Sequence, residues 1–136
     1  MATIFGVLLT EVLYLKPGEQ KNFCIVDAAM NDLPRPAMYQ AHHGIVPVAP
    51  RQGATICYEV LGPVCASGDW LGHDRDLNVQ QGDLVAVLSA GAYCMAMASN
   101  YNTRGRAAEV LVDGDTARVI RQRETAADQM RLETLL

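Results

Sequence analysis

A short loop near the middle of the chain combines a thiol, a glycine and a carboxylate. Its sequence is CASGD at residues 65–69, and an apolar run at residues 55–61 leads into it. The glycine allows a sharp backbone turn, so the end of a strand would present the Cys65 thiol as a reactive group. The alternative is an ordinary loop with a half-buried cysteine, because free cysteines are among the most buried residues in proteins.

Runs of branched apolar residues predict the strands that must position this loop. Pro17 and Gly18 favour a turn that joins the first two runs into a hairpin, and Asp113-Gly114 is the strongest short hairpin signal further along. We therefore expect a mainly β fold, a β-sandwich or a Greek-key barrel, in one domain that spans residues 1–136. The predicted strands are residues 4–15, 22–26, 55–61, 83–88, 108–112 and 116–120.

Two or three short helices should complete this fold. Residues 37–41 predict a helix that begins near Pro34 or Pro36, with Asn31-Asp32 as its cap, because proline suits a first helical turn. Thr125 is a suitable N-cap for a final helix over residues 125–135. The polar or proline-containing segments 42–53 and 74–83 predict loops and turns.

Composition limits the classes of partner and compartment. The 136 residues carry a net charge of −4, and the 11 basic residues are scattered, which argues against a nucleic-acid partner. No apolar run approaches the roughly 20 residues of a membrane span, and we expect no signal peptide. Four cysteines without a C-x-x-C pair favour a reducing cytoplasm over a disulfide framework. Of these, Cys24 and Cys57 lie in strand-like runs and are expected in the core.

Three further motifs accompany the CASGD loop: DAAMNDLPRPAMY at residues 27–39, GAY at 91–93 and SNYN at 99–102. In this order they resemble the C-terminal part of the pyridoxal-phosphate (PLP) decarboxylases, the family that includes diaminopimelate decarboxylase. The resemblance runs from Gly6 to the final helix. It implies the C-terminal β domain of the alanine racemase-like decarboxylases, without the (β/α)8 barrel that precedes that domain in the family.

The resemblance implies an activity that this stretch of sequence would not complete alone. The implied reaction converts meso-diaminopimelate to L-lysine and CO2 with PLP, in a homodimer that also needs the barrel domain. A PLP enzyme requires a lysine in a desolvated pocket. The two lysines, Lys16 and Lys21, flank a predicted surface turn, so we expect the isolated chain to be inactive.

The resemblance also assigns roles to individual residues. Cys65 matches the proton donor, which the family delivers across a dimer interface. Arg35 and Tyr39 match residues that bind the far carboxylate of the substrate, and Tyr93 matches a tyrosine that contacts both cofactor and substrate. Asp69 would hold the loop and face positive charge in the partner's site. Ordinary surface or core positions are the alternative for the arginine and the tyrosines, and a turn that bonds its own backbone is the alternative for Asp69.

One position departs from the family pattern. Diaminopimelate decarboxylases usually carry Glu after the cysteine, where it meets the distal ammonium of the substrate, and here that residue is Ala66. A decarboxylase of another basic amino acid, such as ornithine or arginine, is therefore an alternative, as is a non-catalytic decarboxylase-like binding module. Asn100-Tyr101-Asn102 is expected to give structural support, and His42 and His43 are expected to be loop residues rather than metal ligands.

Overall fold

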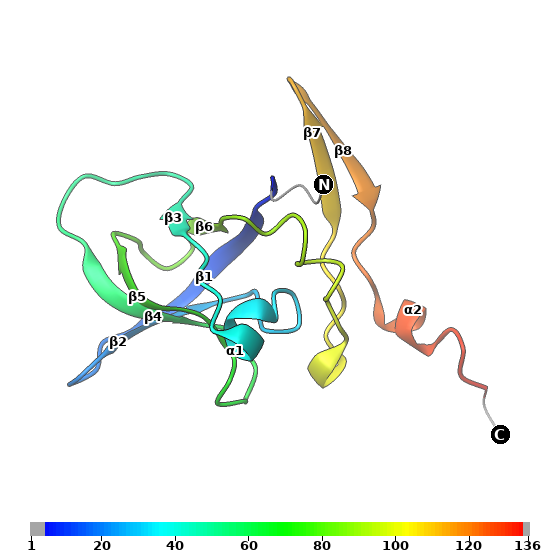
Figure 1. Cartoon of the computed structure of the whole chain (residues 1–136), viewed down its shortest axis with the longest axis horizontal. Helices are drawn as coiled ribbons and strands as arrows, with labels where there is room; N and C mark the ends of the chain where they lie inside the picture. The colour runs from blue at the N-terminus through cyan, green and yellow to red at the C-terminus, as the bar shows by residue number, and fades with distance from the viewer. Residues whose placement is uncertain (1–4, 135–136) are drawn as a thin grey trace. The chain divides into compact units, whose positions relative to one another are not determined.

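The computed structural model describes residues 5–134, which form two compact units that divide between Ala98 and Ser99. The prediction of a mainly β fold is confirmed, whereas the assignment of residues 1–136 to one domain stays a prediction. The first unit contains β1 (Leu8–Lys16), β2 (Asn22–Val26), α1 (Arg35–Tyr39), β3 (Ile45–Pro47), β4 (Ile56–Leu61), β5 (Trp70–Leu77) and β6 (Leu84–Val87) (Figure 1). The second contains a 3-10 turn (Tyr101–Thr103), β7 (Glu109–Asp113), β8 (Thr116–Arg121) and α2 (Ala126–Met130).

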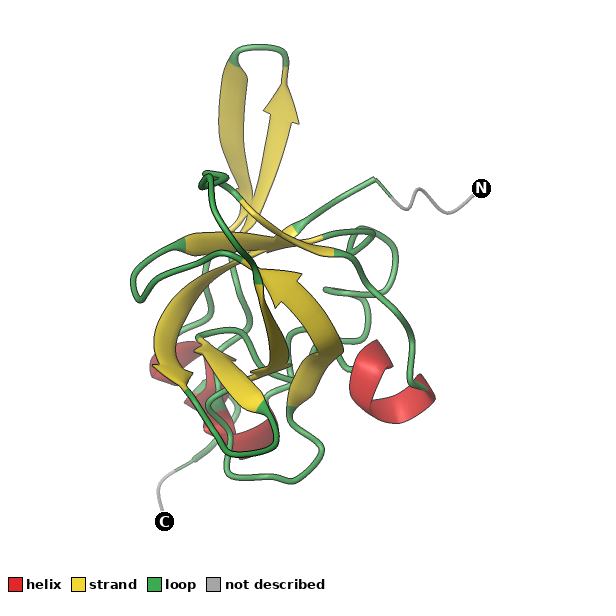
Figure 2. Cartoon of the chain, turned by 90° about the vertical axis from the view of Figure 1, so that its left-hand side faces the viewer, coloured by secondary structure: helices red, strands yellow, loops and turns green. Residues whose placement is uncertain are grey.

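The first unit is a six-stranded sheet with the order β3-β6-β1-β2-β4-β5. Strand β1 serves two neighbours, since its first half pairs with β6 and its second half with β2. The edge strands β3 and β5 also meet, because a Cβ at Gly72 would lie 3.1 Å from Ile45 Cδ1. The sheet therefore curls almost closed, like a barrel (Figure 2).

The core of this unit follows from the strand period of two. Along β1, Leu8, Thr10 and Val12 are buried while the residues between them are exposed. The buried Thr10 hydroxyl is hydrogen-bonded: it donates to Asp27 Oδ1 and accepts from the backbone N–H of Ala28 at 2.8 Å. Other fully buried apolar side chains include Cys24, Val26, Ala29, Leu33, Val60, Leu71, Leu77, Val85 and Val87.

Two strands of the sheet were not predicted. Residues 45–47 and 70–77 were assigned wholly or partly to loops and turns, and the structure places β3 and β5 there. Strand β3 has only three residues and contains Pro47, so its run of apolar residues is too short to predict a strand. Strand β5 buries Leu71 and Leu77 but carries polar side chains between them. Strand β3 pairs with β6, and strand β5 pairs with β4. These pairings stabilise both strands, and the sequence pattern does not show them.

The prediction for the two strand cysteines was half right. Cys24 is fully buried, and that burial raises the pKa of its thiol to about 11. Cys57 is exposed, which corrects the expectation of a core position. It lies on the first, exposed part of β4, with its sulfur 4.0 Å from Asp74 Oδ1 across the β4–β5 hairpin.

The second unit keeps the predicted hairpin and shortens the predicted helix. Strands β7 and β8 join around Gly114, whose φ of 57° requires the left-handed region. Thr125 is the N-cap of α2, as predicted, and it also forms a capping box with Asp128. The helix ends at Met130 rather than at the predicted residue 135, which lies outside the described residues. Asn100 supports this unit, because its amide donates to the Arg104 carbonyl at 3.0 Å and to Glu124.

Across the described residues no helix is long and apolar enough to cross a bilayer.

The strands of the sheet hold one buried carboxylate, Glu59 on β4, which is 5% exposed. Lys21 Nζ lies 2.8 Å from one of its oxygens, and His73 of β5 hydrogen-bonds the other through Nδ1. Burial acts to raise the pKa of Glu59, but the hydrogen bonds from His73 and Lys21 outweigh it and leave that pKa below its ordinary value.

A lowered carboxylate pKa predicts a pH-dependent contribution to stability. Glu59→Gln should lower the free energy of unfolding at pH 7 by about 1–3 kcal/mol, the usual worth of hydrogen bonds to a charged group. The Glu59 contribution is present above the unfolded-state pKa and is lost as pH falls through the lower folded-state pKa. The difference between variant and parent, measured by urea unfolding, should therefore shrink below about pH 4. Glu19→Gln, on the exposed 17–21 turn, is the matched control, and an equal effect of both variants at pH 7 would contradict the prediction.

Candidate functional site

The Cys65 loop is the connection between β4 and β5. Leu61 and Trp70 pair at its base, and the Gly62 N–H donates to the Asp69 carbonyl at 3.0 Å. The Cys65 side chain is exposed near the tip of this loop. The loop therefore presents a thiol to solvent from a base that is fixed by the sheet.

The carboxylate of Asp69 fastens this loop to a distant segment. Asp69 is only 3% exposed. One of its oxygens accepts the N–H of Val64, inside the loop, and the other accepts the N–H of Met30, each at 2.7 Å. A Cβ at Gly62 would lie 2.4 Å from the first of these oxygens, so glycine is required there for the carboxylate to reach both amides.

The segment that Asp69 holds leads directly into α1. Asp32 stabilises its turn, since one carboxylate oxygen accepts the Ala29 N–H at 3.0 Å and the other accepts the Asn31 side chain at 3.2 Å. Helix α1 begins at Arg35, near the predicted start at Pro34 or Pro36, but it ends at Tyr39 rather than at residue 41. Its N-cap is Pro34, which forms no side-chain hydrogen bond. Asn31 and Asp32 thus shape the turn before the helix, which corrects their predicted role as its cap.

Two contacts bring the GAY motif against this segment. The guanidinium carbon of Arg35 lies 5.1 Å from the ring centroid of Tyr93, within cation–π range. The thiol of the next residue, Cys94, donates to the Asp32 carbonyl at 3.1 Å. Arg35 and Tyr93, which are 58 residues apart by their numbers, therefore lie together. The sequence analysis assigned no role to Cys94, because a single cysteine outside any motif does not indicate a contact of this kind.

The remaining predicted site residues differ in their exposure. Tyr39 is 60% exposed at the end of α1, one turn after Arg35, so both side chains can serve one ligand. Ala66 is partly exposed beside Cys65, and its N–H and carbonyl are both bonded within the loop, to Val64 and Asp69. Tyr93 is 49% exposed beside Arg35.

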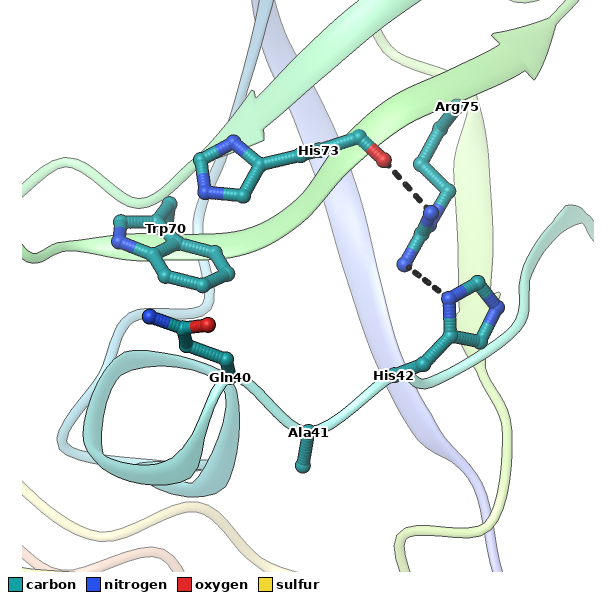
Figure 3. A pocket seen from close by; sticks show the side chains of 6 residues that line it. All are labelled: Gln40, Ala41, His42, Trp70, His73 and Arg75. Atoms are coloured by element: carbon teal, nitrogen blue, oxygen red, sulfur yellow. Dashed lines mark hydrogen bonds between the residues drawn. The ribbon is translucent and has the colours of Figure 1, made fainter.

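A pocket of about 390 Å³ opens between β5 and the residues that follow α1 (Figure 3). Trp70 lies between the Gln40 side chain and the His73 ring, whose centroid is 3.8 Å from that of the indole. Arg75 donates to the His73 carbonyl at 2.6 Å and contacts His42 Nδ1 at 3.1 Å. The sequence analysis missed this pocket: Arg75 lies in the segment 74–83, which was interpreted as a polar turn, and Trp70 and His73 received no role.

The His42-His43 pair does lie outside helices and strands, as predicted. His42 lines this pocket, whereas His43 is 4% exposed and pairs through Nδ1 with the Leu88 carbonyl at 2.9 Å. Within the part of the chain that the structure describes, no group of three His, Cys, Asp or Glu side chains is arranged to hold a metal ion.

The lysines do not form a Schiff-base site. Lys21 is bonded to Glu59 with its side chain 58% exposed, and Lys16 is exposed at the end of β1. A Schiff-base lysine must be held in a desolvated pocket. The residues of this chain therefore do not fit the covalent attachment of PLP.

Comparisons with known proteins show which family the chain is similar to. Residues 4–91 match the family described as "Pyridoxal-dependent decarboxylase, C-terminal sheet domain". Diaminopimelate decarboxylases of Vibrio cholerae and Pseudomonas aeruginosa are 56% and 58% identical over 131 residues, which is 96% of this chain. The crystal structure of diaminopimelate decarboxylase from Helicobacter pylori complexed with L-lysine superimposes with a TM-score of 0.85 at 43% identity, over 93% of this chain and 31% of that one. The chain spans about a third of the length of the curated relatives, 31% and 32% respectively.

The crowding around Gly62 predicts a selective loss of stability. In Gly62→Ala the added methyl group must displace the Asp69 carboxylate from its two amide donors, so the free energy of unfolding should fall by roughly 2–4 kcal/mol. Gly68→Ala, in the same loop, is the control, because a Cβ there meets no atom within 4 Å. That control should change stability by no more than about 0.5 kcal/mol. Denaturant unfolding of the two variants measures both values, and equal losses would show that the carboxylate is not the cause.

Proposed function

The chain belongs to the pyridoxal-dependent decarboxylases as their C-terminal sheet domain, and from this we propose that it is the sheet domain of a diaminopimelate decarboxylase. The proposed enzyme converts meso-diaminopimelate to L-lysine and CO2. One observation carries the proposal: an exposed thiol stands on a loop that is fastened to the segment bearing Arg35. Identities of 56–58% to diaminopimelate decarboxylases over nearly the whole chain support the choice of substrate.

The proposal divides the chemistry between this chain and its partners. An N-terminal (β/α)8 barrel holds PLP, which supplies the electron sink for loss of the carboxylate. The second subunit of a homodimer completes the site, and this chain delivers Cys65 into it. Because all four cysteines are free thiols, the proposal places the enzyme in the reducing cytoplasm.

Each site residue then has one task. Cys65 donates a proton to the carbon that has lost CO2, a task for which a thiol with a reference pKa of about 8.5 is suited when the site keeps it protonated. Arg35 and Tyr39 hold the far carboxylate of the substrate, because a planar guanidinium can bind a carboxylate through two hydrogen bonds. Tyr93 lies against Arg35 and contacts both substrate and cofactor.

A chimera tests the role of Cys65. This chain would replace the matching C-terminal third of the P. aeruginosa relative, which supplies its own barrel. Cys65→Ala should lower kcat for diaminopimelate by about 10²–10⁴-fold, the usual worth of a positioned acid. Cys57→Ala, which removes an exposed thiol on β4, should leave kcat unchanged. An active Cys65→Ala chimera would remove this thiol from the mechanism.

Ala66 favours a second candidate, a decarboxylase of ornithine or arginine, because it offers no charge to a distal ammonium. If the substrate is diaminopimelate, Ala66→Glu adds that charge and should raise kcat/KM in the chimera by about 10- to 100-fold, equivalent to roughly 1.5–3 kcal/mol. Ala66→Gln is the uncharged control of similar size. A fall in kcat/KM on diaminopimelate, with higher activity of the unmodified chimera on ornithine or arginine, would favour the second candidate.

A further inference from the structure

The Asp69 carboxylate connects two parts of the site that have different tasks. Its first oxygen binds the Val64 N–H, one residue before Cys65, and its second binds the Met30 N–H, five residues before Arg35. Met30 and Asp69 are 39 residues apart in the chain. The positions of the thiol and of the guanidinium therefore both depend on one side chain.

The chemistry of this connection requires a carboxylate. Both partners are backbone N–H donors, and an ionised carboxylate offers acceptors only, on both oxygens. An asparagine would turn its NH2 group toward one of these N–H donors and lose that hydrogen bond. Because Asp69 is 3% exposed, water cannot readily replace the lost partner, and a buried unpaired donor is costly.

The segments beyond these two bonds are themselves fixed. On one side, the loop is closed by the Gly62–Asp69 backbone bond at 3.0 Å at the end of the β4–β5 hairpin. On the other, the turn from Met30 to Arg35 is held by the Asp32 carboxylate and by the Cys94 thiol. A displacement at Asp69 would thus move each segment as a unit.

We propose that Asp69 is a positioning residue that sets the location of the Cys65 thiol relative to the substrate held by Arg35. The proposal rests on the proposed decarboxylase function. Asp69 does not itself touch the substrate or transfer a proton. It acts through Cys65 on the protonation step and through the Met30–Arg35 segment on substrate binding. Misplacement of a reacting group by about 1 Å can cost 10²-fold in rate.

A double-mutant cycle in the chimera tests this coupling. Asp69→Asn should lower kcat for diaminopimelate by roughly 10- to 100-fold when Cys65 is present. In the Cys65→Ala background, the same change should lower kcat by no more than about twofold, because the group that Asp69 positions is already gone. The KM for diaminopimelate should rise in both backgrounds, since the Arg35 segment does not depend on the thiol.

A purely structural role for Asp69 predicts a different pattern. It would lower kcat by the same factor in both backgrounds, and that result would overturn the inference while leaving the proposed function standing. If Cys65→Ala alone leaves kcat unchanged, the proposed function fails and the inference fails with it. Should Asp69→Asn not fold, Gly62→Ala replaces it in the cycle, because it displaces the same carboxylate while keeping Asp69, and the same two patterns decide.

Discussion

The site depends on the pair of hydrogen bonds that the buried Asp69 carboxylate accepts from Val64 and Met30. A buried carboxylate is unfavourable unless its oxygens are paired, and here both oxygens are paired with backbone N–H groups. The two donors belong to different segments, so the same bonds that satisfy the charge also join the segments. Gly62 makes this possible by leaving room for the carboxylate.

The barrel-like sheet provides the frame for this connection. Strand β4 ends and strand β5 begins at the Cys65 loop, and their pairing fixes the base of the loop. Strand β2 lies parallel to β4 and leads into the turn before α1, so the two segments emerge from neighbouring strands. The buried Glu59 on β4 also bonds to Lys21, just before β2, and to His73 on β5. The fold thus brings two chemically distinct loops to one region by ordinary strand pairing.

Sequence pattern predicted the strands with continuous apolar runs, namely β1, β2, β4 and β6, and the β7–β8 hairpin with its Asp-Gly turn. It did not predict β3, which has only three residues, or β5, whose buried Leu71 and Leu77 are separated by polar residues and which, among the described strands, pairs only with β4. The motifs identified Cys65, Arg35 and Tyr93, but the contact of Arg35 with Tyr93 and the bond from Met30 to Asp69 link residues far apart in sequence. Such contacts arise from tertiary packing, which a single sequence does not encode as a local pattern.

One carboxylate holds the Val64 and Met30 amides at once, and native-state hydrogen exchange of this chain measures that directly. In the unmodified chain, both amides should exchange slowly, as do amides bonded within the sheet. In Asp69→Asn, protection should fall at Met30 and Val64 together, while the Leu33 amide, bonded to the Ala29 carbonyl at 3.2 Å, should lose less. Fast exchange of both amides in the unmodified chain, or unchanged protection of both in the variant, would show that the Asp69 carboxylate does not hold them.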